Sequence, residues 1–174
     1  MNQFTYQVLM DTTQKTVIKL TGAFDGTSQE SNTYRIMANT LYGALDANNV
    51  PLGSALSVSN TPLPYYNLQV TRIIYTVNMG TTGYVQLYWQ GTTPTTIVNL
   101  NRNGEYGEHL NMPSIPNNAV GANGHIGITT VGAGSNCSYT IVLELRKDNA
   151  MYQRGQFNDP AAFNFGDYSI TPPG

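Results

Sequence analysis

Hydrophobic and polar residues alternate with a period of two along much of the chain, which is the pattern of β-strands with one buried face. Phe4 to Met10 forms the first such run, and Ile18, Leu20 and Phe24 share one face of the second. Tyr34 to Met37 favours a strand because Thr40 and Gly43 weaken the alternative of a helix. Later runs predict strands over Gln69–Asn78, Tyr84–Trp89, Thr96–Leu100, His125–Val131 and Cys137–Arg146.

Turn signals separate these runs. Asp25–Gly26, Asn103–Gly104 and Asn123–Gly124 each predict a turn, because Asn, Asp and Gly tolerate turn geometry. About eight short strands with such turns predict a single all-β domain, a β-sandwich or jelly roll, over residues 1–146. A long connection rich in Ser, Asn and Pro, from Asp46 to Tyr66, interrupts them and is expected to be functional or packed on a neighbour.

Residues 147–174 differ from the rest of the chain. They contain the aromatic residues Phe157, Phe163, Phe165 and Tyr168 but almost no aliphatic ones, so they are not expected to build a core of their own. We expect them to form an extended C-terminal arm that lies on the domain or on a neighbouring subunit.

Charge is scarce. Charged residues make up 10% of the chain, against about 25% in an ordinary domain. The net charge of -2 argues against nucleic-acid binding, which needs clustered Lys and Arg. No signal peptide and no apolar run of membrane-spanning length is recognised, so we expect synthesis in a host cytoplasm and no membrane partner.

Few side chains suggest chemistry. Glu105, Glu108 and His109 lie close together in the sequence, but this glycine-rich segment favours a solvated loop over a metal or acid–base site. His125 is expected to have a surface or capping role, and Cys137 to be a small buried hydrophobe. We therefore predict no enzyme activity and assign no catalytic residue, metal ligand or cofactor.

Aromatic residues allow two interpretations. A platform including Tyr84, Tyr88 and Trp89 would suit stacking against sugars, whereas core and interface roles are the commoner use of Tyr and Trp. We favour the second interpretation. The residues predicted to contact a partner are Tyr65 and Tyr66, which follow Pro62 and Pro64 in the long connection, and Phe157, Phe163, Phe165 and Tyr168 of the arm.

Four segments carry a resemblance to a known class of protein. They are the opening FTYQVLMDTTQKTVIKLTGAFDG, NTLYGALD at 39–46, TPLPYY at 61–66, and ELRKDNAMYQRGQFNDPAAFN at 144–164. Their sequence resembles virion structural proteins of tailed bacteriophages, particularly marine and cyanobacterial ones. The resemblance spans most of the chain and contains no catalytic motif.

The resemblance implies a particle component. The leading expectation is a non-enzymatic capsid decoration or cement protein at the capsid surface, bound to the major capsid protein or other virion proteins as a homo-oligomer, a trimer. The alternative is a tail or fibre β-sandwich that recognises host surface glycans. A hydrolase that uses His109 with Glu105 or Glu108 is a third, weaker hypothesis.

Overall fold

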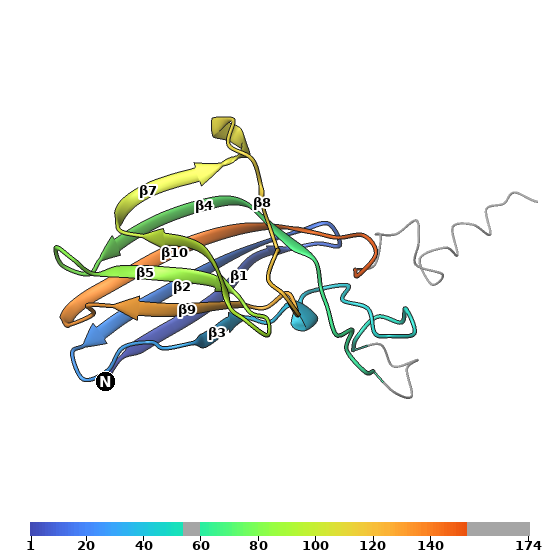
Figure 1. Ribbon diagram of the computed structural model, residues 1–174, viewed down its shortest axis with the longest axis horizontal. Coiled ribbons are helices and arrows are strands. Elements are labelled where there is room, and N and C mark those ends of the chain that lie inside the picture. The colour runs from blue at the N-terminus through green and yellow to red at the C-terminus, as the bar shows by residue number, and fades with distance from the viewer. Residues whose placement is uncertain (54–59, 153–174) are drawn as a thin grey trace, which may run out of the picture.

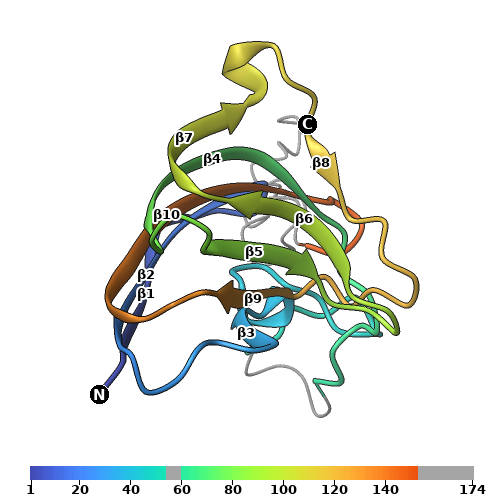
Figure 2. The same ribbon diagram turned by 60° about the vertical axis from the view of Figure 1, so that its left-hand side comes forward.

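The computed structural model describes residues 1–53 and 60–152, and these form one all-β domain with two antiparallel sheets packed face to face (Figures 1 and 2). The larger sheet has the order β1-β2-β10-β4-β7, with β8 also paired to β4. Its strands are β1 (Gln3–Asp11), β2 (Lys15–Asp25), β10 (Ser135–Lys147), β4 (Leu68–Asn78), β7 (Arg102–Gly107) and β8 (Ile115–Pro116). The smaller sheet has the order β3-β9-β5-β6, from β3 (Thr33–Ile36), β9 (Ile126–Val131), β5 (Tyr84–Trp89) and β6 (Thr95–Leu100).

The strand order is that of a jelly roll. Four antiparallel pairs, β2 with β10, β3 with β9, β4 with β7 and β5 with β6, are the pairs made when one long hairpin rolls into two sheets. β1 extends the larger sheet beyond β2. Two single-turn 3-10 helices, η1 (Ala38–Thr40) and η2 (Glu108–Leu110), lie between strands.

The core lies between the sheets and consists of the side chains that the alternating pattern placed on one face of each strand. Ile18 and Leu20 of β2 and Ile141 of β10 are fully buried, as are Leu87 and Trp89 of β5 across the sandwich. Full burial of one such aliphatic side chain stabilises the fold by about 1.5–3 kcal/mol. The prediction that Trp89 belongs to the core is confirmed.

The predicted strands are all present, but the prediction of a turn at Asn103–Gly104 is wrong. Asn103–Gly104 is not a turn: both residues lie inside β7, paired with Thr76 and Tyr75 of β4. A Cβ atom at Gly104 would lie 2.5 Å from the Tyr75 hydroxyl oxygen. Glycine at this position therefore leaves room for the Tyr75 ring on the neighbouring strand and does not mark a turn.

The chain stays on the domain beyond β10. Lys147 ends that strand and is buried, and the backbone N–H of Tyr152 donates to the carbonyl of Asp148. Tyr152 is fully buried and forms a bridge with Ala44. Residues 147–152 of the predicted arm thus pack against the described domain, and residues 153–174 lie outside the description.

Candidate functional site

The outer edge of β1 is the strongest candidate for a binding site. Between Gln3 and Val8 the strand pairs with β2 in regular antiparallel register, and a bulge follows between Val8 and Met10. Within residues 1–53 and 60–152, no strand pairs with the opposite side of β1. We call this unpaired side, along Gln3–Asp11, the β1 edge. Backbone N–H and C=O groups on such an edge are available to an added strand.

Apolar side chains are exposed along the same strand. Tyr6 and Val8 pair with Leu20 and Ile18, whose side chains are fully buried, so they face the same side of the sheet as the core. Nevertheless, Tyr6 is 43% exposed and Val8 44% exposed. Leu9 is also exposed at the bulge. The described part of the smaller sheet therefore leaves the core-facing side of β1 partly uncovered.

The beginning of β1, in contrast, is covered. The Phe4 ring packs edge-on against Phe24 with centroids 5.5 Å apart, and the Arg35 guanidinium lies 4.4 Å from the Phe4 ring centroid. Arg35 Nε donates to the buried Glu30 carboxylate at 2.7 Å, and the Tyr139 hydroxyl donates to the other oxygen of that carboxylate at 2.7 Å. This network connects both sheets, and it holds the Arg35 guanidinium in place over the Phe4 ring.

A buried lysine fixes the other end of β1. Lys147 Nζ donates to Asp11 Oδ1 at 2.5 Å, to the Thr12 carbonyl at 2.6 Å and to the Tyr42 carbonyl at 2.8 Å. Its side chain is fully buried, and it lies 4.9 Å from the centroid of the Tyr152 ring. Burial lowers the pKa of Lys147, and the Asp11 carboxylate opposes that shift. The charge of Asp11 is thus compensated inside the protein.

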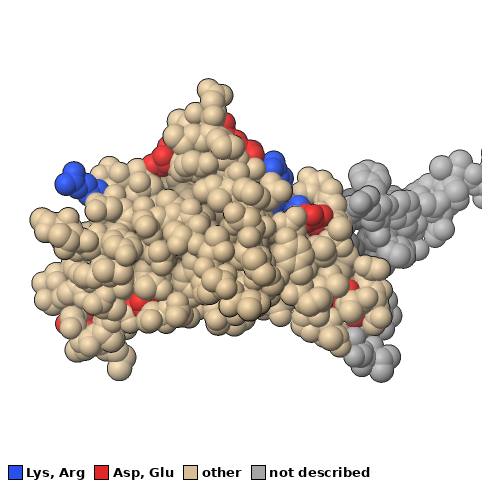
Figure 3. Space-filling model, in the orientation of Figure 1, with Lys and Arg blue, Asp and Glu red and all other residues tan. Residues whose placement is uncertain are grey.

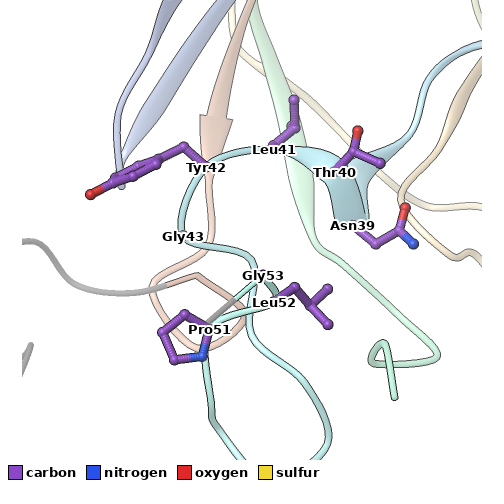
Figure 4. Close-up of a pocket in the computed structure, with 8 residues that line it drawn as sticks. All are labelled: Asn39, Thr40, Leu41, Tyr42, Gly43, Pro51, Leu52 and Gly53. Atoms are coloured by element: carbon purple, nitrogen blue, oxygen red, sulfur yellow. The ribbon is translucent and has the colours of Figure 1, made fainter. Parts of the chain in front are cut away.

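Tyr42 adds an exposed aromatic side chain beside this end of β1. Its backbone N–H donates to Asp11 Oδ2 at 2.8 Å, and its side chain is 60% exposed. Figure 4 shows the ring turned away from an open hollow of about 430 Å³ between residues 39–43 and 51–53. The hollow is lined by Asn39, Thr40, Leu41, Tyr42, Gly43, Pro51, Leu52 and Gly53.

The β1 edge is uncharged up to Asp11, which pairs with Lys147. No charged residue occurs between Gln3 and Met10. Partial burial, together with the nearby Asp11, raises the pKa of Tyr6, so its hydroxyl remains protonated at neutral pH. Charged side chains are also sparse on the face drawn in Figure 3. An uncharged strand edge with exposed apolar side chains is suited to contact with another protein strand.

The candidate acid–base residues form ordinary surface ion pairs. Glu105 lies on β7, where its Oε1 accepts from Arg72 Nε at 2.8 Å and lies 3.0 Å from His109 Nε2. Arg72, followed by His109, lowers the pKa of the Glu105 carboxyl. Glu108 instead pairs with Arg146 at 3.3 Å. The expectation of a loop is wrong, since the segment forms β7 and the helix η2, but the three side chains are exposed to solvent as expected.

Tyr66 is a core residue, which corrects its predicted role as a partner contact. It is 1% exposed, and its hydroxyl donates to the Leu45 carbonyl at 2.7 Å and accepts from the Leu63 N–H at 3.1 Å. Tyr65 is half-buried, and partial burial followed by the charge of Asp148 raises its pKa. The other predicted contacts, Phe157, Phe163, Phe165 and Tyr168, lie outside the described residues.

The remaining candidates are structural. The predicted capping role of His125 is confirmed, since its Nδ1 accepts the Ala38 N–H at 3.0 Å at the start of η1. Burial lowers the pKa of His125. Tyr88 is 3% exposed and Trp89 fully buried, so neither contributes to an exposed stacking platform. The half-buried Cys137 is a free thiol whose Sγ accepts the Gly134 N–H at 3.2 Å.

Two further kinds of feature are absent from the part of the chain that the structure describes. No group of three or more His, Cys, Asp or Glu side chains in residues 1–53 and 60–152 is arranged to hold a metal ion. No helix in this part of the chain is long and apolar enough to cross a membrane.

Comparison of the chain with protein-family models, with curated proteins and with solved structures gave no match.

The residues of the β1 edge were not among the predicted contacts, although a signal for them exists in the sequence. The run from Gln3 to Met10 alternates as a strand but contains no Lys, Asp, Glu or Pro, the residues that often protect sheet edges. The pattern predicts the strand itself. Its position at an edge depends on pairings formed much later in the chain.

Proposed function

We propose that this protein is a non-enzymatic structural component of a phage virion, a decoration or cement protein that binds the major capsid lattice. The observation that carries the proposal is the β1 edge, where exposed Tyr6, Val8 and Leu9 accompany unpaired strand backbone within the described domain. Such an edge is suited to hold another protein chain. It offers a partner both hydrogen bonds and apolar contact.

The fold supports the same class of function. Jelly rolls occur in viral capsid proteins and in lectins, although a fold alone does not define a function. The scarcity of charge also fits a protein whose contacts depend on shape and hydrogen bonding. The resemblance of four segments to tailed-phage virion proteins supports a role as a component of the phage particle.

Binding would occur by strand addition. An extended strand of a neighbouring subunit in the particle would align with β1, take up its free backbone groups and cover the side chains of Tyr6 and Val8. A single short strand supplies modest affinity. On a lattice the same contact is repeated many times, and once one contact has formed, the neighbouring binding sites are held at a high effective concentration, which raises the overall affinity.

This function is tested by measuring the copy number of the protein in purified particles of the phage that encodes it. Quantitative mass spectrometry would measure its ratio to the major capsid protein. Hundreds of copies per particle are expected for a decoration protein. Absence from the particle, or a dozen copies or fewer, would contradict a lattice role.

Recognition of host glycans by a tail or fibre module is the second candidate. It is favoured by one observation, the exposed Tyr42 beside the open hollow that also contains Asn39. This role predicts few copies per particle and loss of adsorption in Tyr42→Ala. Unchanged adsorption in that variant would contradict it.

A further inference from the structure

The β1 edge lacks most of the features that prevent strand edges from pairing with one another. It has no charge and no proline from Gln3 to Met10, and its first six residues pair regularly with β2. The bulge between Val8 and Met10 is one feature that hinders pairing with another edge, but it lies at one end of the strand. The segment from Gln3 to Val8 therefore forms a regular, uncharged template.

The other sheet edges are less open to such pairing. β7 carries Arg102 and Glu105, and β3 is only four residues long. β6 is uncharged, but none of its side chains is among the large exposed hydrophobic ones. Of these edges, that of β1 combines the longest strand with exposed apolar side chains.

We propose that the β1 edges of two copies of this chain pair antiparallel about a two-fold axis at Tyr6, which joins the two larger sheets into one. The inference rests on the proposed role in assembly and names a second copy of the chain as the partner. A contact between identical edges is complete with two copies. It therefore predicts a dimer where the sequence suggested a trimer.

The register follows from the sequence of the strand. With Tyr6 opposite Tyr6, Phe4 of each copy lies opposite Val8 of the other, and Thr5 lies opposite Gln7. Aromatic and β-branched residues are favourable cross-strand neighbours, and the polar pair lies on the opposite face. A shift by one residue would place apolar side chains opposite polar ones, and a shift by two would move Phe4 or Val8 out of the regular segment.

Burial and charge also fit a second copy. Because the axis is perpendicular to the sheet, the exposed Tyr6 and Val8 of both copies lie on the same side and form one apolar strip. No like charges oppose each other along the paired segment. Two charged groups next to the segment are compensated inside the protein, since Asp11 pairs with Lys147 and the Arg35 guanidinium over Phe4 pairs with Glu30.

Charge-swap variants of the full chain test the proposal. Dimerisation of the wild-type protein would be measured by size-exclusion chromatography with light scattering over a concentration series. Tyr6→Lys and Tyr6→Glu each place two like charges across the axis and are expected to weaken dimerisation about tenfold or more. An equal mixture of the two variants should restore a heterodimer, because opposite charges then face each other.

The matched control is Ile74→Lys. Ile74 is 40% exposed, close to the exposure of Tyr6, but it lies on β4 inside the same sheet. This variant should dimerise like the wild type. Circular dichroism of each variant checks that the fold is retained, and Val8→Lys provides a second disruption if Tyr6→Lys does not fold.

Several results would overturn the proposal. These are a wild-type protein that stays monomeric at the highest concentration, a trimer, a dimer insensitive to the charge at Tyr6, or a mixture that fails to restore association. The capsid role would survive such results, because the copy number per particle measures it separately.

Discussion

Lys147 is predicted to be among the residues on which the stability of the domain depends most. Its ammonium group donates to Asp11 and to the carbonyls of Thr12 and Tyr42, and its side chain is fully buried. Lys147→Met keeps the apolar stem and removes the charge and all three donors. The Asp11 carboxylate, only 16% exposed, then loses its cation.

The expected cost follows from these contacts. Removal of one partner of a buried ion pair typically costs about 3–5 kcal/mol, because the other charge remains buried. Asp11 keeps the Tyr42 N–H as a donor, so we expect about 3 kcal/mol. In a domain of this size such a loss lowers the melting temperature by roughly 6–12 °C.

Urea unfolding of the full chain, followed by circular dichroism, would measure this cost. The matched control is Lys15→Met, because Lys15 pairs with Glu144 at 2.9 Å but is 42% exposed. That surface pair should contribute less than about 1 kcal/mol. If Lys147→Met lowered the free energy of unfolding no more than Lys15→Met, the argument that burial makes the Lys147 contacts strong would be refuted.

Two further predictions concern stability. Gly127→Ala should destabilise the domain by about 1–3 kcal/mol in urea unfolding, because the added Cβ would lie 2.1 Å from the Tyr88 ring. Gly134→Ala is the control and should be nearly neutral, because a Cβ there would have no atom within 4 Å. His125 has a lowered pKa in the folded state, so protonation favours unfolding, and its contribution should be present above pH ~6.5 and decline as the pH falls below that value. His125→Gln should reduce the loss of stability between neutral pH and pH 5, measured by thermal unfolding, and an identical pH profile would contradict the role of His125 as acceptor for Ala38.

The sequence allowed the strands and the buried face of most of them to be predicted, because alternation reports directly on one-sided burial. β7 was missed because Asn103–Gly104 has the composition of a turn, and the real cause of the glycine is the Tyr75 ring on a strand distant in sequence. Local patterns contain no information about such a neighbour.

The candidate site was harder to predict for the same reason. Tyr66 was expected at a surface because it lies in a proline-containing connection, but its hydroxyl has two backbone partners inside the domain. Tyr6 was predicted to lie on a strand, yet its exposure depends on how far the smaller sheet extends over the larger one. Both outcomes are set by tertiary packing.

The central place of β10 has a consequence for synthesis of the protein. β2 ends at Asp25, but its neighbour on the side away from β1 begins at Ser135, about 110 residues later. At ordinary ribosomal rates this interval lasts on the order of ten seconds. During that interval the β1–β2 hairpin has no β10 beside it, so both of its edges are open to pairing with other strands.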